Sequence, residues 1–179
     1  RGLGDVYKRQ LLLDVAAKAA AVARERGDGP VLYVTGEESA SQVRLRAERI
    51  DALDPGLLLA AETEMGALLG HVEAAGPSLL VVDSVQTIAS AQVEGSAGGV
   101  TQVRAVAGAL IAVAKERNIP VLLVGHVTKD GGIAGLSSVT RGEVVTYNGE
   151  PVVTFFFSTS GGRTEDVEPL VIPTRIVLR

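Results

Sequence analysis

Acidic and polar side chains follow three apolar segments of this sequence at the point where each segment ends. Glu37 and Glu38 come after VLYVTG, Asp83 ends LLVVD, and His126 ends VLLVGH. If the segments are parallel strands, these groups meet at one edge of a sheet, where open α/β folds bind ligands and where a carboxylate can reach Mg²⁺ and phosphates. Each residue alone could be a helix cap or a solvated loop residue. Together they predict a binding site.

Alternating strand and helix patterns would position these residues. Apolar residues at helical spacing, β-branched runs and cap residues such as Ser39 and Gly27 mark the elements. We predict helices over 11–26, 39–50, 64–75 and 100–117, strands over 30–36, 57–61, 77–84 and 119–126, and a loop over 90–99. The alternation predicts an α/β fold with a doubly wound, mainly parallel sheet.

The composition narrows the class of protein further. The chain has 179 residues, 46% of them apolar and 3% aromatic, and no cysteine. This length suits one domain, and the lack of cysteine excludes a disulfide framework and a Cys-based zinc site within it. The net charge of −4 does not indicate nucleic-acid binding. No apolar run is long enough for a membrane span or a signal peptide, so we expect a cytoplasmic protein without membrane contact.

The C-terminal part has a different pattern. Residues 143–157 read as two strands around Asn148-Gly149, a frequent hairpin turn signal, and residues 170–178 as another strand interrupted by Pro173. We therefore predict a β-rich tail after the α/β core.

Residues 11–135 resemble the RecA-like ATPase core of the RadA (Sms) family of bacterial DNA repair proteins. The segments that carry the resemblance are LLLDVAAKAAAVARERG, VLYVTGEESASQVRLRAERI, LLVVDSVQTI and VAKERNIPVLLVGHVTKDGGIAG. It implies a RecA-like P-loop NTPase fold, ATP and Mg²⁺ as cofactors, and DNA-dependent ATP hydrolysis that drives branch migration during recombination. It also implies DNA and a RecA-type recombinase as partners and a homo-hexameric ring. Zinc belongs only to the family's N-terminal four-cysteine finger, which this sequence lacks.

The resemblance assigns roles to the residues at the strand ends. Glu37 matches the glutamate that polarises the attacking water, and Glu38 is a weaker candidate for this base. Asp83 matches the Walker B aspartate of the Mg²⁺ shell, which holds the ion through water. His126 matches the catalytic position that senses the γ-phosphate. These are the groups that phosphoryl transfer needs.

Three other polar residues have less definite roles. Thr128 and Lys129 belong to the family's GHVTK segment and would face DNA or a neighbouring subunit, although an exposed lysine is usually only solvated. His71 lies in a predicted polar helix, and we expect a surface residue without a role.

The N-terminal residues depart from the family's phosphate loop, G-x-x-G-x-G-K-S-T. In that loop backbone N–H groups and a lysine bind phosphates, and a hydroxyl ligates Mg²⁺. Lys8 is in register with the lysine and is a degenerate cofactor-binding candidate, but Tyr7 replaces a glycine, and Arg9 and Gln10 replace the hydroxyl residues. We expect residues 1–10 to be a non-native junction and the chain, truncated at both ends, to be inactive as written.

The tail also departs from the family, because residues 136–179 lack its K-N-R-F-G motif. No function is carried onto them. Two alternatives stay open: a non-catalytic RecA-like regulatory or assembly module, which the altered loop favours, and an α/β regulator that binds a nucleotide or another phosphorylated ligand without hydrolysis. The second would need Asp83 but not Glu37.

Overall fold

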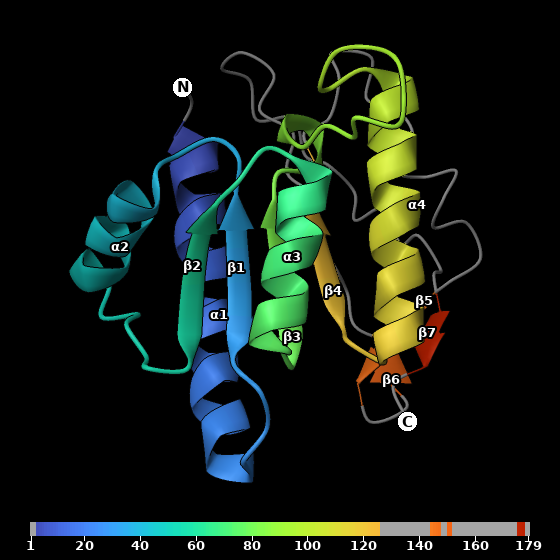
Figure 1. Cartoon of the computed structure of the whole chain (residues 1–179). Coiled ribbons are helices and arrows are strands. Elements are labelled where there is room, and N and C mark those ends of the chain that lie inside the picture. The colour runs from blue at the N-terminus through green and yellow to red at the C-terminus, as the bar shows by residue number, and fades with distance from the viewer. Residues whose placement is uncertain (1–2, 126–143, 148–149, 152–174, 178–179) are drawn as a thin grey trace.

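A parallel four-stranded sheet forms the centre of the molecule. The computed structural model describes residues 3–125, 144–147, 150–151 and 175–177, with side chains for 9–125. The strands are β1 (Val31–Thr35), β2 (Leu57–Ala61), β3 (Leu79–Asp83) and β4 (Val121–Val124), in the order β2-β1-β3-β4 (Figure 1). The predicted parallel sheet is confirmed, although β3 and β4 are each shorter than expected.

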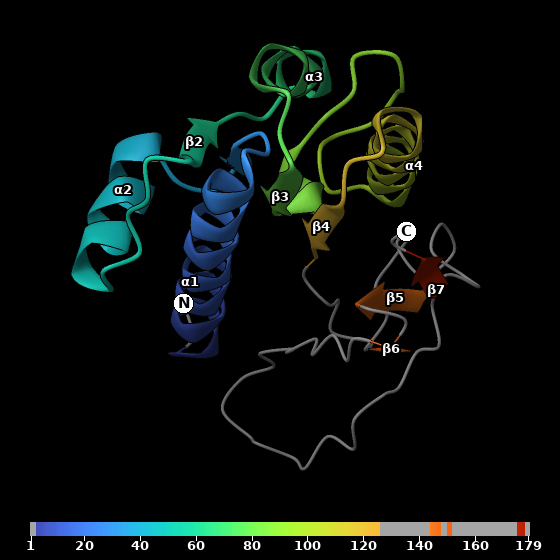
Figure 2. The ribbon, with the colours of Figure 1, turned by 90° about the horizontal axis from the view of Figure 1, so that it is seen from below.

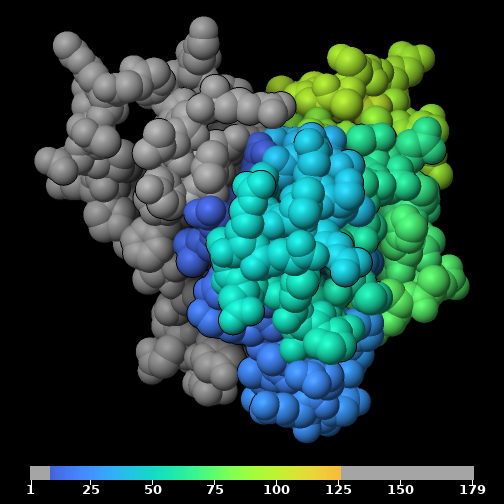
Figure 3. Space-filling model, turned by 90° about the vertical axis from the view of Figure 1, so that its left-hand side faces the viewer, coloured from blue at the N-terminus to red at the C-terminus, as the bar shows by residue number. Residues whose placement is uncertain are grey.

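Helices cover both faces of this sheet, as a doubly wound fold requires. Figure 2 shows α1 (Leu3–Arg26) and α2 (Ala40–Arg49) on one face and α3 (Met65–Ala75) and α4 (Val100–Arg117) on the other. The view from the side of α2 in Figure 3 shows this helix alongside α1, with which it is in contact. A short 3₁₀ turn, Val85–Thr87, follows β3.

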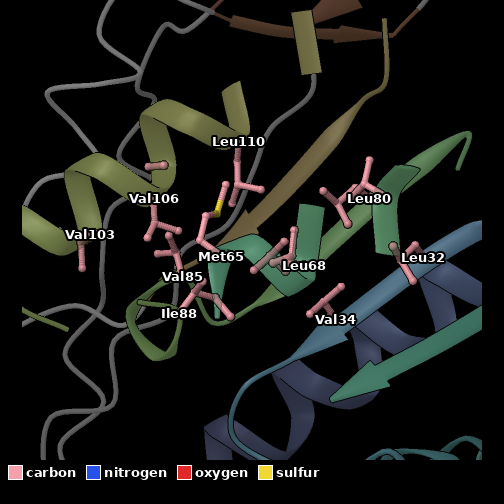
Figure 4. Close-up of a cluster of buried hydrophobic side chains, with 13 residues drawn as sticks. Leu32, Val34, Met65, Leu68, Leu80, Val85, Ile88, Val103, Val106 and Leu110 are labelled. Atoms are coloured by element: carbon pink, nitrogen blue, oxygen red, sulfur yellow. The ribbon is translucent and has the colours of Figure 1, made fainter. Parts of the chain in front are cut away.

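The core has one apolar cluster on each face, because the strands are buried on both sides. Between the sheet and α3/α4, the cluster includes Leu32, Val34, Leu68 and Leu110 (Figure 4). On the α1/α2 face, small side chains such as Ala16 and Ala20 let α1 approach the strands closely. Each fully buried aliphatic side chain contributes about 1.5–3 kcal/mol relative to an exposed one.

The helix ends agree with the sequence signals except at the N-terminus. Ser39 caps α2, and its capping box with Gln42 is complete. Gly27, just after α1, has a φ of 74°, which glycine adopts without strain. The predicted start of the first helix was wrong: it begins at Leu3 instead of 11. Residues 3–10 contain no proline and only one glycine, so nothing in them stops the helix.

The tail forms short strands where it is described. These are β5 (Val144–Tyr147), β6 (Glu150–Pro151) and β7 (Arg175–Val177), in a sheet of order β6-β5-β7. The antiparallel β5/β6 pair is the predicted hairpin, and β7 lies within the predicted last strand. The turn residues 148–149 and Pro173 lie outside the described residues. Among the helices that the structure describes, none has the length and apolar character needed to cross a membrane.

Candidate active site at the carboxyl ends of the strands

The ends of β1, β3 and β4 are in register, which brings their last residues to one edge of the sheet. Thr35 of β1 pairs with Asp83 of β3, and Asp83 pairs with Val124 of β4. The backbone N–H of Gly36 extends the β1/β3 pairing by donating to the Asp83 carbonyl oxygen at 3.1 Å. The segments that follow β1 and β3 therefore start side by side.

A tight turn after β1 directs Glu37 and Glu38. The Thr35 hydroxyl oxygen accepts hydrogen bonds from the backbone N–H groups of Glu37 (3.3 Å) and Glu38 (3.4 Å). A β-carbon at Gly36 would lie 2.1 Å from Oγ1 of Thr87, so only glycine fits between β1 and the 3₁₀ turn. The glycine of the T-G-E-E sequence is therefore required at position 36.

Glu37 contacts the segment that follows β3. The hydroxyl of Ser84, which is fully buried, donates to Glu37 Oε1 at 3.1 Å. Ser84 follows Asp83 through a cis peptide bond. The Ser84 hydrogen bond and the β1/β3 register hold Glu37 and Asp83, to which the family resemblance gives the roles of base and metal anchor, at the same edge.

Asp83 is bound by a residue that the sequence analysis did not select, Tyr33 of β1. The Tyr33 phenol donates to Asp83 Oδ2 at 2.9 Å, and both residues are buried. Burial raises the pKa of the phenol well above its ordinary value, and the Asp83 carboxylate raises it further. Tyr33 pairs with Val81, which places it diagonally opposite Asp83 on the same face. That register is the signal that could have revealed it.

Arg9 of α1 is the second residue that was missed. Its guanidinium donates to Glu37 Oε2 and also forms an ion pair with Glu38 Oε1 at 3.1 Å. The Arg9 side chain is only 7% exposed. From the sequence, Arg9 was notable only as a residue that cannot replace a hydroxyl, and no sequence signal indicates these ion pairs.

Glu38 is held by a second arginine. Arg46 of α2 donates to Glu38 Oε1 at 2.5 Å. This hydrogen bond holds the pKa of Glu38 below its ordinary value, and the charge of Arg9 adds to the effect. Glu38 is therefore occupied by two cations, whereas Glu37 has Arg9 and the Ser84 hydroxyl. Of the two glutamates, Glu37 is the one linked to the residue that follows Asp83, through the Ser84 hydroxyl.

A hollow of about 250 Å³ lies beside the acids, at the ends of β1 and β2. Its lining residues are Thr35, Gly36, Glu37, Glu38, Ala61, Glu62 and Thr63. Backbone N–H donors of Glu64 and Thr63 hold the pKa of Glu62 below its ordinary value. His71 is exposed on α3 as expected, with Nε2 3.8 Å from Glu62 Oε2.

The loop after β3 is fixed by one buried side chain, Gln102 of α4. Its amide oxygen accepts from the backbone N–H of Ser90 (2.9 Å), and its NH₂ donates to the carbonyl oxygens of Ser90 (3.1 Å), Val93 (2.5 Å) and Gly95 (3.2 Å). These bonds give the predicted loop 90–99 a defined path.

The other predicted site residues are only partly covered. Lys8 lies within α1, and its side chain is outside the described residues. His126, Thr128 and Lys129 also lie outside them. Across the part of the chain with described side chains, no three His, Cys, Asp or Glu residues form a ready metal cluster.

The donor set at Asp83 nevertheless fits Mg²⁺. This ion takes oxygen ligands and is usually held by one or two carboxylates together with substrate phosphates and water. Asp83 and Ser84 supply a carboxylate and a hydroxyl at the end of a buried parallel strand. Such an edge, with acids that could orient a water, is the arrangement found in nucleotide-binding α/β domains.

Comparisons with known proteins agree with this class. A family model described as AAA domain matches residues 2–132, so the chain belongs to this family of nucleotide-binding domains. The chain is 48% identical over 136 residues to DNA repair protein RadA of Mycobacterium tuberculosis (strain CDC 1551 / Oshkosh), a match that covers 75% of the chain and 27% of that protein.

A second relative confirms the resemblance to the RadA family. DNA repair protein RadA of Streptococcus pneumoniae (strain ATCC BAA-255 / R6) is 46% identical over 130 residues, covering 73% of the chain and 30% of that protein. The chain thus spans less than a third of the length of these curated relatives.

Proposed function

We propose that the chain contains the ATPase core of a RadA-type DNA repair protein. The observation that carries the proposal is the placement of Glu37 and Asp83 at one sheet edge, tied together by Ser84. The identity to proteins named DNA repair protein RadA and the AAA domain match support the reaction class in this proposal, ATP hydrolysis coupled to work on DNA. Branch migration, a RecA-type recombinase partner and a hexameric ring are further parts of this proposal.

The residues at this edge of the sheet have separate roles in the proposed reaction. Glu37 orients and deprotonates the attacking water, since its carboxylate is held by Ser84 and its backbone by Thr35. Asp83, oriented by Tyr33, would hold Mg²⁺ through water. When bound, that ion would neutralise charge on the phosphates. We propose His126 as the γ-phosphate sensor, because it lies two residues after the end of β4 in the sequence.

We propose that the unmodified chain does not hydrolyse ATP. Residues 3–10 lie in α1. In a helix the backbone N–H groups lie parallel to the helix axis, and beyond the first turn each donates a hydrogen bond within the helix. A phosphate loop needs a glycine-rich bend with N–H groups directed inward. Tyr7 replaces a glycine of this bend, and Arg9 and Gln10 replace the residues whose hydroxyl ligates Mg²⁺.

The test uses a chain in which residues 2–10 are replaced by the family-type G-x-x-G-x-G-K-S-T loop. In this background Glu37→Gln should retain nucleotide binding and slow ATP hydrolysis by roughly 10² or more, the scale of a lost general base. Glu38→Gln is the matched control and should have a smaller effect. If Glu38→Gln stops turnover and Glu37→Gln does not, the two roles are reversed.

A non-catalytic regulatory or assembly module is the second candidate. The ion pairs of Arg9 with Glu37 and Glu38 favour it, because they occupy the carboxylates that hydrolysis would use. A chain with the family-type loop that binds ATP, but shows no turnover with DNA at any concentration tested, would support this candidate instead.

A further inference from the structure

Thr87, in the 3₁₀ turn after β3, contacts both of the segments that carry Glu37 and Asp83. Its hydroxyl donates to the carbonyl oxygen of Ser84 at 2.7 Å, and its backbone N–H donates to the same oxygen at 3.1 Å. Gly36 packs against the same side chain, since a β-carbon there would lie 2.1 Å from Thr87 Oγ1 and 2.6 Å from Thr87 Cβ. One side chain therefore contacts the segment after β1 and the segment after β3.

The turn that carries Thr87 is anchored in the core by the apolar residues Val85 and Ile88. Both are fully buried in the cluster between the sheet and α3/α4 (Figure 4). Because the turn is anchored, the hydroxyl of Thr87 fixes the orientation of the Ser84 peptide carbonyl. Ser84 in turn donates through its own hydroxyl to Glu37 Oε1 at 3.1 Å. These contacts form a path from the core through Thr87 and Ser84 to Glu37.

We propose that Thr87 is a positioning residue for Glu37. A threonine hydroxyl that binds a nearby backbone carbonyl is common in turns. Here that carbonyl belongs to the residue that holds Glu37, and the same threonine packs against Gly36, which directly precedes Glu37. Loss of the Thr87 hydroxyl frees the Ser84 peptide to rotate, so the Ser84 hydroxyl no longer fixes Glu37. The inference rests on the proposed function, because Glu37 is the proposed base.

Turnover is measured first, in the chain whose residues 2–10 are replaced by the family-type loop. Thr87→Val keeps the side-chain shape and removes the hydroxyl. It should lower kcat at least about tenfold, since a slightly misplaced group can cost about a hundredfold, and change nucleotide binding by less than about twofold. Thr87→Ser keeps the hydroxyl and should retain kcat within about threefold. Thr101→Val is the matched control, because it makes the same change at an exposed position of α4 and should not alter kcat.

Non-additivity distinguishes positioning through Ser84 from a general loss of structure. In Ser84→Ala, which lacks the hydroxyl that binds Glu37, adding Thr87→Val should lower kcat by less than about twofold more. If Thr87→Val does not fold, Thr87→Ser and Thr87→Ala repeat the comparison, since they differ only in the hydroxyl. An unchanged kcat in Thr87→Val, or an equal fall with and without Ser84→Ala, would overturn the proposal.

A second measurement uses the unmodified chain and does not depend on ATP hydrolysis. Urea denaturation of Ser84→Ala, Glu37→Gln and their double variant gives the coupling between the two side chains. This coupling should be about fivefold in the unfolding equilibrium constant with Thr87 present and less than about twofold in the Thr87→Val background. No coupling with Thr87 present, or equal coupling in both backgrounds, would overturn the proposal. Coupling that is lost in Thr87→Val, together with no turnover by the chain with the family-type loop, would contradict only the proposed function.

Discussion

The hydrogen bond between Tyr33 and Asp83 links the centre of the sheet to its edge. Tyr33→Phe keeps the buried ring and removes only the hydroxyl, so it leaves a buried carboxylate oxygen without this donor. We expect a loss of about 1–3 kcal/mol in the free energy of unfolding, the range for a buried group left unsatisfied. Urea denaturation of Tyr33→Phe, Asp83→Asn and the double variant measures it. Strictly additive effects would show that the two groups are not coupled.

Glu38 makes stability depend on pH in a predictable direction. Its folded-state pKa is lowered, first by the hydrogen bond from Arg46, so its contribution is present above the unfolded pKa of about 4.3. The contribution is lost as the pH falls through the lower folded-state value. Glu38→Gln should therefore cost about 1.5–3 kcal/mol near pH 7, and the difference from the parent should shrink below about pH 4.

The control for this measurement is Glu48→Gln. Glu48 pairs with Arg44 on the surface of α2 and is 42% exposed, so its removal should cost no more than about 0.5 kcal/mol. Denaturation curves at several pH values compare the two variants. A Glu38→Gln effect that stays constant down to pH 3 would contradict the assigned ion pairs.

At the scale of elements, the turn between β1 and α2 depends on the absence of a side chain at Gly36. In Gly36→Ala, the added methyl group would lie 2.1 Å from Thr87 Oγ1 and 2.6 Å from its Cβ. We expect a loss of about 1–3 kcal/mol, as for overpacking elsewhere. Gly108→Ala in α4 meets no atom within 4 Å and should instead stabilise the protein by about 0.4–1 kcal/mol. Thermal unfolding of the two variants measures both effects. Equal effects would contradict the close approach of Gly36 and Thr87.

The loop after β3 depends on one side chain of α4. Gln102→Leu keeps an apolar body but leaves the carbonyl oxygens of Ser90, Val93 and Gly95 without their donor. Amide hydrogen exchange across 90–99 should become at least about tenfold faster, because local opening costs less free energy. Gln92→Ala changes an exposed side chain of the same loop and should not alter exchange. Unchanged exchange in Gln102→Leu would show that the loop is held by other contacts.

The sequence predicted most helices and strands of the core closely, but it predicted the contacts of the site residues only in part. Periodicity and caps located α2, α3 and α4 closely, because each has a clear apolar face or a cap residue. The start of α1 was predicted wrongly because residues 3–10 align with a phosphate loop, although they contain no proline and only one glycine that would oppose a helix. Local patterns contain no information on what an extended helix would touch.

The site was predictable where it followed from strand ends and unpredictable where it depended on packing. Asp83 and Glu37 were identified because parallel strands deliver their last residues to one edge. Tyr33 was hidden in an apolar run, and only the β1/β3 register shows that it faces Asp83. The ion pairs of Arg9 depend on how α1 packs against the β1–α2 turn, which spacing along the chain does not specify.

At the scale of the whole molecule, the sheet and its two helical layers would position a nucleotide site whose phosphate loop is altered. The strand order, the acids at the edge and the AAA domain match all agree with nucleotide binding. Residues 2–10 are where we propose that the phosphate loop is altered. Because α1 begins at Leu3, replacing these residues changes its first turns and also removes Arg9.

Calorimetric titration with a non-hydrolysable ATP analogue and Mg²⁺ tests the central claim most directly. It compares the unmodified chain with the chain in which residues 2–10 are replaced by G-x-x-G-x-G-K-S-T. We predict only weak nucleotide binding by the unmodified chain, and at least about a hundredfold tighter binding after the replacement, since the loop supplies inward N–H donors and a metal-ligating hydroxyl. Tight binding by the unmodified chain, or none by either chain, would contradict the assignment of this edge as an ATP site that lacks a working phosphate loop.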